Sequence, residues 1–174
     1  MFDDAIMLAA ENLLASGRRR GVMLATAESC TGGLIAGALT AVAGSSDVFD
    51  RGFVTYTNEA KHEMLGVPES LLAAHGAVSE PVARAMAEGA LARSRAAVAV
   101  AVTGIAGPGG GSADKPVGLV WFGLAGRGIA TVADRQVFPG DRAGVRRATV
   151  ERALSLLAVA LHHLPDRAPD DTDA

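Results

Sequence analysis

The chain has 174 residues, of which 49% are hydrophobic, 20% charged and 4% aromatic, with a formal net charge of −3 at pH 7. The length fits a single domain, and the slightly negative charge argues against nucleic acid as a partner, which would require a basic patch. No apolar run reaches the roughly 18 residues of a membrane span, and residues 1–4 are unlike the start of a signal peptide.

Two further features suggest where the protein works and where its domain ends. Cys30 is the single cysteine and cannot form an internal disulfide, so we expect a cytoplasmic protein. Residues 165–174 are polar and rich in proline and aspartate, which predicts a disordered tail. Residues 1–164 are therefore expected to form one domain.

The first half of the chain predicts four helices and two strands before a longer fifth helix. Apolar residues at helical spacing predict a helix over residues 3–16, which the sequence GRRRG then breaks. The following elements are a buried strand at 22–25, a helix from 34 to about 43, a strand over 49–57, and helices at 58–65 and 69–74. A longer helix is expected to open at residues 79–81, where Ser-Glu-Pro is typical of a helix start.

The second half predicts three strands and a closing helix. The run of small apolar residues at 96–103 is typical of a strand buried on both faces. A glycine-rich loop covers 104–116, strands at 117–124 and 129–138 form a hairpin, and a long helix spans 141–163. Helices alternating with strands, followed by a hairpin, predict an α/β fold in which helices cover both faces of a mixed sheet.

The stretch TAESCTGG, residues 26–33, lies where a strand gives way to a helix. Polar side chains at that point face the sheet edge where α/β proteins bind ligands, and the N–H groups around Gly32 and Gly33 could bind an oxyanion or a phosphate. Two interpretations stay open on spacing alone: Ser29 or Thr31 caps the helix, or Ser29 is a nucleophile. Cys30, lying between apolar elements, is more typical of a small buried residue than of a nucleophile.

Tyr56 and Lys61 form a second candidate group, at the end of a predicted strand and one helical turn beyond it. A lysine at the start of a helix is usually a solvated surface charge. It can also act as the base for a serine when burial or a neighbouring cation lowers its pKa.

The segment from Thr103 to Ser112 reads TGIAGPGGGS and follows the most buried strand. Its glycines allow a close approach to a ligand, although a plain mobile connector is equally compatible. The segment is neither a P-loop nor a dinucleotide-binding fingerprint. Asp141 is predicted to cap the last helix, so that Arg142 lies in its first turn, where a cation opposes the helix dipole and hints at an anionic partner. A plain surface arginine is the alternative.

Five segments in order are TAESCTGG, AGSS, RGFVTYTNEAK, HGAVSEPV and TGIAGPGGGSADKPVG. Together they closely resemble the CinA C-terminal domain family, over about residues 3–161. The resemblance implies a nicotinamide-nucleotide amidohydrolase, or nicotinamide mononucleotide deamidase, with a three-layer α/β/α sandwich and a mixed, mostly parallel five-stranded sheet. It also implies a homodimer, and the start of the chain is typical of the stand-alone form of the family.

The resemblance implies a catalytic serine at Ser29, a lysine at Lys61 and a tyrosine at Tyr56, with Thr103 and Arg142 in substrate binding. We expect Tyr56 to orient Lys61 or share its proton transfer, and Glu28 to face the pyridinium charge. The other expected substrate contacts are Cys30, Thr31, Gly32 and Gly33 around the oxyanion, and Gly104 at the start of the glycine-rich loop. The phosphate is expected to contact the loop at Gly107, Gly110 and Ser112, together with Ser45 or Ser46 and Arg142.

No metal or organic cofactor is expected, because the four histidines and the cysteine are not spaced as metal ligands. Two rival functions stay open. One is a non-catalytic module that binds a nucleotide or phosphate. The other is a metal-dependent phosphate or pyrophosphate hydrolase, which requires a carboxylate cluster that the spacing of Asp47, Asp50 and Glu59 does not suggest.

Overall fold

The computed structural model describes residues 2–165, so that residues 166–174 of the predicted tail lie outside the described part. The elements are α1 (Asp4–Arg20), β1 (Leu24–Glu28), α2 (Leu34–Thr40), the 3-10 helix η1 (Ser45–Asp47), β2 (Phe49–Val54), α3 (Asn58–Leu65), α4 (Glu69–His75), α5 (Glu80–Ala92), β3 (Val98–Gly104), β4 (Leu119–Gly126), β5 (Ile129–Val137) and α6 (Arg142–His163).

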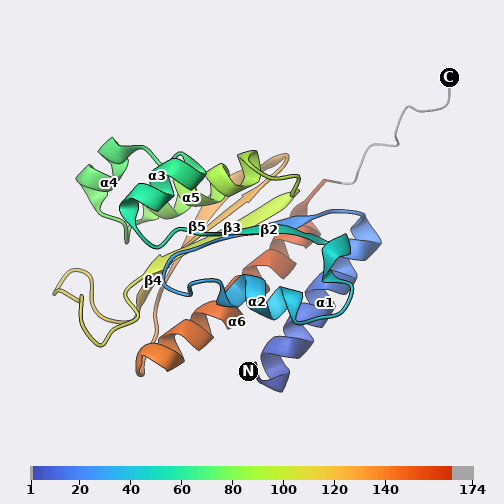
Figure 1. Cartoon of the computed structure of the whole chain (residues 1–174), viewed down its shortest axis with the longest axis horizontal. Coiled ribbons are helices and arrows are strands. Elements are labelled where there is room, and N and C mark those ends of the chain that lie inside the picture. The colour runs from blue at the N-terminus through green and yellow to red at the C-terminus, as the bar shows by residue number, and fades with distance from the viewer. Residues whose placement is uncertain (1, 166–174) are drawn as a thin grey trace.

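The strands within residues 2–165 form one five-stranded sheet in the order β2-β1-β3-β4-β5. β1 pairs in parallel with both β2 and β3, whereas the β3–β4 and β4–β5 pairings are antiparallel. Four of these strands therefore run in one direction and β4 runs against them. Helices α1, α2 and α6 cover one face of the sheet and α3, α4 and α5 cover the other (Figure 1). The predicted three-layer sandwich with a mixed, mostly parallel sheet is confirmed.

The central strand β3 shows how one sequence serves two faces. Its valines at positions 98–102 belong to the core shared with α1, α2 and α6, while Ala99 and Ala101 belong to the core shared with α5. This alternation follows from the two-residue period of a strand. Small residues let α5 lie close to the sheet: a Cβ atom on Gly123 of β4 would be only 2.0 Å from the carbonyl oxygen of Ala83.

The first helix is longer than the sequence pattern predicts. It continues through Gly17 to Arg20 and ends at Gly21, which has a φ of 61°. A Cβ atom at position 17 would lie 2.4 Å from Cγ1 of Val48, so Gly17 serves close packing rather than a helix stop. The strand after it, predicted at 22–25, runs instead from Leu24 to Glu28.

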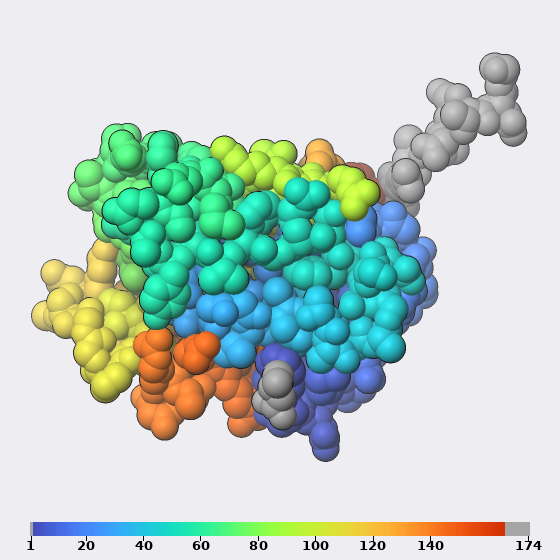
Figure 2. All heavy atoms as spheres, viewed as in Figure 1, coloured from blue at the N-terminus to red at the C-terminus, as the bar shows by residue number. Residues whose placement is uncertain are grey.

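The carboxyl ends of β2, β1 and β3 lie next to one another because the three strands are parallel. Hydrogen bonding continues past the strand ends: Ser29 N donates to Val102 O at 3.0 Å, and Thr55 N donates to Glu28 O at 2.8 Å. The residues that follow these strands are thereby fixed to the sheet. In the space-filling view, the glycine-rich loop (yellow) and the start of α6 (orange) meet at one corner of the molecule (Figure 2).

Candidate active site

Ser29 is the first residue after β1, and the main chain fixes it on both sides. Its N–H donates to Val102 O on β3, and its carbonyl accepts from Gly32 N at 3.1 Å in the turn that leads to α2. The residue is 9% exposed. Ser29 therefore lies at the carboxyl edge of the sheet, in a turn with little freedom to move.

Lys61 reaches this serine from the opposite layer of the molecule. It lies on α3 and is 1% exposed, and its Nζ lies 3.1 Å from Oγ of Ser29. Helix side chains lean toward the helix N-terminus, so the Lys61 chain runs back from α3 to the end of β2. Of the two interpretations of Lys61, the structure supports the buried partner of Ser29 over the solvated surface charge.

Two main-chain carbonyls fix the orientation of the Lys61 amine. Nζ donates to Thr55 O at 2.9 Å and to Thr57 O at 3.4 Å. Burial, which disfavours the ammonium form, lowers the pKa of Lys61 below its ordinary value. A lysine in this state is available as a proton acceptor nearer neutral pH than a solvated one.

Cys30 lies beside the pair but is not activated. The side chain is buried, and burial raises the pKa of the thiol to about 11. The thiol is thus protonated at neutral pH, whereas a nucleophilic cysteine requires the thiolate. The structure supports the interpretation of Cys30 as a small buried residue.

Glu28 anchors α2 rather than facing a ligand. Its carboxylate is buried and accepts hydrogen bonds from Thr26 Oγ1, Thr31 Oγ1, Gly33 N, Ile35 N and Ala36 N. A carboxylate at a helix N-terminus satisfies the unpaired N–H groups of the first turn. The expected contact of Glu28 with a pyridinium charge is replaced by this role, and the Thr31 side chain belongs to the same network.

The expected oxyanion donors also change. Gly32 N is bonded to Ser29 O and Gly33 N to the Glu28 carboxylate, so neither glycine has a free N–H. The N–H groups of Cys30 and Thr31, in contrast, donate to no main-chain carbonyl among residues 2–165. These two adjacent donors follow Ser29 directly and are the ones available to an oxyanion.

Tyr56 lies at the edge of the site, away from the lysine amine. Its side chain is 59% exposed, and its hydroxyl accepts from Nη2 of Arg142 at 3.0 Å. Nη1 of the same arginine donates to Gly107 O, also at 3.0 Å. Arg142 thus bridges the segment after β2 and the loop after β3. Within the described chain Tyr56 makes no hydrogen bond to Lys61, and the carbonyls of its two neighbours orient that amine instead.

Only the first residues of the glycine-rich loop lie at the site, whereas residues 109–114 project away from it. Thr103 is buried and donates through Oγ1 to Ala77 O at 2.9 Å, and Gly104 packs against β4. Gly107 accepts the Arg142 bond described above. Residues 108–114, which include Gly110, are exposed, and the loop projects from the sheet (Figure 1). Ser112 forms a local turn, its Oγ accepting from Lys115 N at 3.1 Å.

A pocket of about 600 Å³ lies between the base of this loop and the start of α6. Pro108 and Val117 line the loop side, and Arg142 and Arg146 line the helix side. Nη2 of Arg146 donates to Thr31 O at 2.9 Å, which connects the pocket to the turn that carries Ser29. The sequence analysis did not place Arg146 in the site, although its spacing of four residues from Arg142 puts both on one helix face.

The model of the CinA C-terminal domain family matches residues 7–161, which is most of the chain. The chain belongs to the CinA C-terminal domain family.

Its CinA relatives fall into two lengths. Nicotinamide-nucleotide amidohydrolase PncC of Escherichia coli K12 is 52% identical over 90% of this chain and 95% of its own length. A competence-damage inducible protein of Symbiobacterium thermophilum is 61% identical, but the match covers 79% of this chain and 34% of the relative. The chain spans about a third of the length of that relative and likewise of a CinA-like protein of Akkermansia muciniphila.

A solved structure from the same family supports the fold. The crystal structure of the competence/damage inducible protein CihA from Agrobacterium tumefaciens is 53% identical, with a TM-score of 0.90. The match covers 94% of this chain and 99% of that one.

One group of expected substrate contacts in this CinA domain lies at the wrong end of the sheet. Ser45 and Ser46 form η1, directly before β2, and Val48 O accepts from Leu24 N at the start of β1. They therefore lie at the amino ends of the parallel strands, a full strand length from Ser29. The structure does not bring these two expected phosphate contacts to the edge of the sheet that carries Ser29.

The acidic residues considered for a metal site do not converge in the CinA domain. Asp50, at the start of β2, is paired with Arg51 and Arg95, and its hydrogen bonds lower its pKa to about 2. Glu59 lies beyond the other end of that strand, on α3. Among residues 2–165, no three of the His, Cys, Asp and Glu side chains group closely enough to bind a metal ion, and no helix is long and apolar enough to cross a membrane.

Proposed function

We propose that this chain hydrolyses the carboxamide of nicotinamide mononucleotide, with Ser29 as nucleophile and Lys61 as general base. The observation that carries the proposal is the buried Nζ of Lys61, 3.1 Å from Ser29 Oγ, at a sheet edge beside an arginine-lined pocket. The name of the E. coli relative, which matches over nearly its whole length, supports the choice of substrate.

In the first step Ser29 attacks the carboxamide carbon. A neutral Lys61 donates its two N–H groups to Thr55 O and Thr57 O, which directs its lone pair toward Ser29 Oγ. Lys61 takes the hydroxyl proton as the new C–O bond forms, in the manner of serine–lysine hydrolases.

The tetrahedral intermediate places negative charge on the former carbonyl oxygen. The N–H groups of Cys30 and Thr31 follow Ser29 directly and donate to no main-chain carbonyl in the described structure, and they belong to a turn that is already fixed. Donors arranged in advance stabilise such charge more effectively than water does.

Lys61 then returns its proton to the amide nitrogen, the C–N bond breaks and ammonia leaves. Water attacks the resulting acyl-enzyme, and Lys61 accepts a proton from this water. As the ester bond breaks, that proton passes to Ser29 Oγ, so that nicotinate mononucleotide departs and the serine and lysine return to their starting states.

The ribose-phosphate part of the substrate extends from Ser29 toward the pocket at the start of α6. Arg142 lies over this path, between Tyr56 and Gly107. We assign Tyr56 to this wall of the site, with Arg142, rather than to proton transfer with Lys61.

An assay of ammonia release distinguishes this amide hydrolysis from a non-catalytic binding module and from a phosphate hydrolase. The purified chain, incubated with nicotinamide mononucleotide and a chelator, is expected to release one ammonia per nicotinate nucleotide formed. Ser29→Ala is expected to retain less than a few per cent of the rate. Ligand-induced thermal stabilisation without ammonia would favour a binding module, and release of inorganic phosphate would favour phosphate hydrolysis. Loss of activity with the chelator and its return with a divalent ion would contradict a cofactor-free site.

We also propose that the protein acts in the cytoplasm, in pyridine-nucleotide recycling, as a homodimer. The partly exposed valines Val132 and Val137 on the edge strand β5 offer apolar surface for association. Light scattering coupled to size-exclusion chromatography should give twice the 17.6 kDa chain mass. A monomeric mass at micromolar concentration would contradict the dimer.

A further inference from the structure

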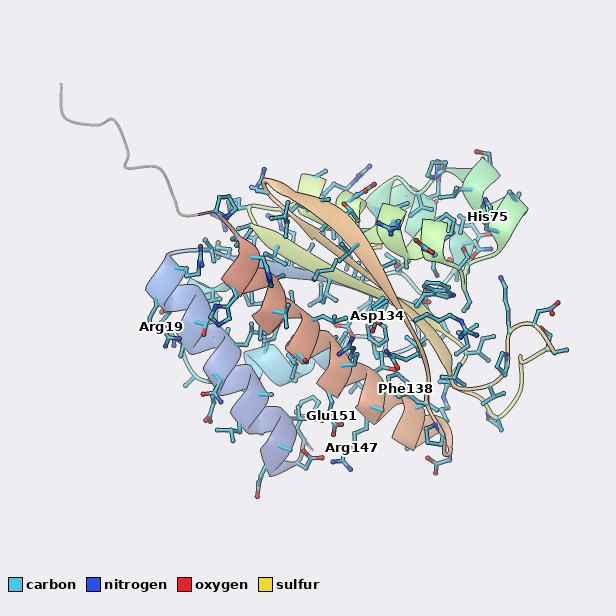
Figure 3. The ribbon with its side chains drawn as sticks, turned by 180° about the vertical axis from the view of Figure 1, so that it is seen from behind. Arg19, His75, Asp134, Phe138, Arg147 and Glu151 are labelled. Carbon is cyan, nitrogen blue, oxygen red and sulfur yellow. The ribbon has the colours of Figure 1, made fainter. Side chains whose placement is uncertain are left out.

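The four arginines of α6 fall into two classes. Arg147 pairs with Asp3 at 2.7 Å and Glu151 at 3.1 Å, and Arg152 pairs with Asp134 at 2.8 Å. Arg147 and Glu151 lie on the side of α6 toward the start of α1, where Asp3 is located (Figure 3). These two arginines have the carboxylate partners expected of structural surface charges.

Arg142 and Arg146 have no carboxylate partner in the described structure. They are four residues apart, share one face of α6 and line the same pocket. Arg142 donates hydrogen bonds to Gly107 O and to Tyr56 OH. Arg146 uses Nη2 for Thr31 O, while its Nε is buried without an acceptor within residues 2–165 and its Nη1 makes no hydrogen bond there.

The pocket therefore has an excess of positive charge. Two guanidinium groups face it with one carboxylate, that of Asp141, whose Oδ1 accepts from Gly144 N at 2.8 Å as the cap of α6. A guanidinium matches the oxygens of a phosphate group with two parallel N–H bonds. A phosphate monoester dianion would balance the positive charge of the pocket and supply hydrogen-bond acceptors for Arg146. A small rotation of the Arg146 side chain would turn its Nε toward the phosphate.

We propose that Arg146 binds the phosphate of the substrate and makes the site selective for a 5′-phosphorylated nicotinamide ribonucleotide over the unphosphorylated riboside. The proposal rests on the proposed function and extends it. The Arg146 bond to Thr31 O fixes where the cation lies relative to the turn that carries Ser29, so the phosphate is bound at a set distance from the reacting carboxamide.

The decisive comparison measures kinetics on two substrates, nicotinamide mononucleotide and nicotinamide riboside. Arg146→Gln is expected to raise KM for the mononucleotide by about 10- to 100-fold, the range for a lost charge-assisted hydrogen bond, with kcat/KM for the riboside within about twofold of the parent. Arg147→Gln, the matched control on the same helix, should leave both substrates within about twofold. Arg146→Lys keeps the positive charge but loses the paired N–H donors of the guanidinium. Its KM for the mononucleotide should lie between those of the parent and of Arg146→Gln.

Two kinetic outcomes would overturn the proposal. An equal loss on both substrates would show that Arg146 acts only through the turn at Thr31. An unchanged KM for the mononucleotide would show that Arg142 or the loop binds the phosphate instead. If Arg146→Gln does not fold, Arg146→Lys decides: unchanged selectivity between the two substrates contradicts the proposal.

A binding measurement separates this inference from the proposed reaction. Ribose 5-phosphate should raise the melting temperature of the parent and of Arg147→Gln, but not of Arg146→Gln, whereas ribose should have no effect on any of them. If the parent releases no ammonia, the proposed function fails while this shift still tests the phosphate site. No shift in the parent at millimolar ligand, or an equal shift in Arg146→Gln, would overturn the inference.

Discussion

The Ser29–Lys61 pair and the arginine pocket at the start of α6 lie close together but are built in opposite ways. At the pair, side chains are buried and main-chain atoms fix them: Ser29 by Val102 O and Lys61 by Thr55 O and Thr57 O. At the pocket, long side chains project from one helix, Arg142 is exposed, and Arg146 retains unpaired donors.

This contrast separates the part of the site that must not move from the part that must adapt. Proton transfer over 3.1 Å tolerates little displacement, so it benefits from anchors that every residue carries in its main chain. Phosphate binding relies on charge and on side chains that can rearrange. An unpaired buried donor such as Nε of Arg146 costs about 1–3 kcal/mol, which a bound anion can offset.

Removing the lysine amine should have the largest effect. We expect Lys61→Met to lower kcat for nicotinamide mononucleotide by about 10³-fold, because Ser29 then lacks its base. The double variant with Ser29→Ala should be no slower than the slower single variant, since the two residues act as a unit. Steady-state ammonia release, with circular dichroism as the folding control, measures this. A residual rate above a tenth would remove Lys61 from the mechanism.

Neutralising the exposed arginine should affect binding more than turnover. Arg142→Gln is expected to raise KM for the mononucleotide by about 10- to 100-fold, with a smaller change in kcat, because the side chain contacts the substrate path and not the reacting atoms. Its melting temperature should stay near that of the parent, because Arg142 is exposed. A large fall in kcat at unchanged KM would contradict the assignment of the arginine pocket to substrate binding and of the Ser29–Lys61 pair to chemistry.

The pH dependence should follow Lys61. Below the lowered pKa of Lys61, kcat/KM should rise about tenfold per pH unit and then level, because the neutral amine is the active form. The free energy of unfolding should also rise with pH between that pKa and the ordinary 10.5, since there the unfolded chain binds a proton that the folded chain has lost. A profile that falls with rising pH would contradict the role of Lys61 as base.

The smallest effect is expected at the thiol. Cys30→Ala keeps the main-chain N–H and should leave kcat within about threefold of the parent, because the thiol is protonated at neutral pH. Alkylating reagents should accordingly modify the folded protein slowly. Loss of activity in Cys30→Ala comparable to that in Ser29→Ala would reopen the choice of nucleophile.

The sequence predicted the layers and the sheet well, because a buried strand such as β3 can be recognised from its own run of small apolar residues. It also brought Ser29 and Lys61 to attention, but not the burial of Lys61, which depends on how α3 packs beside the end of β2. Spacing alone favoured a surface lysine. Its orientation by two carbonyls has no sequence signature, since every residue has a carbonyl group.

The structure places Ser45, Ser46 and Glu28 differently from the sequence-based expectation, for two different physical reasons. The placement of Ser45 and Ser46 could have been corrected from topology, because a helix that joins two parallel strands returns the chain to their amino ends. The role of Glu28 could not. Its carboxylate accepts five hydrogen bonds from its own strand and from the turn and helix that follow, and this network exists only once that turn is folded.

The main-chain support of Lys61 has a consequence for how this site can diversify. Because Thr55 and Thr57 orient the amine through carbonyl oxygens, the side chain between them, Tyr56, can be exchanged without rebuilding the base. Position 56 contacts Arg142 at the mouth of the site. A library of substitutions there should therefore yield altered substrate range with chemistry intact, the combination that both natural divergence and directed evolution require.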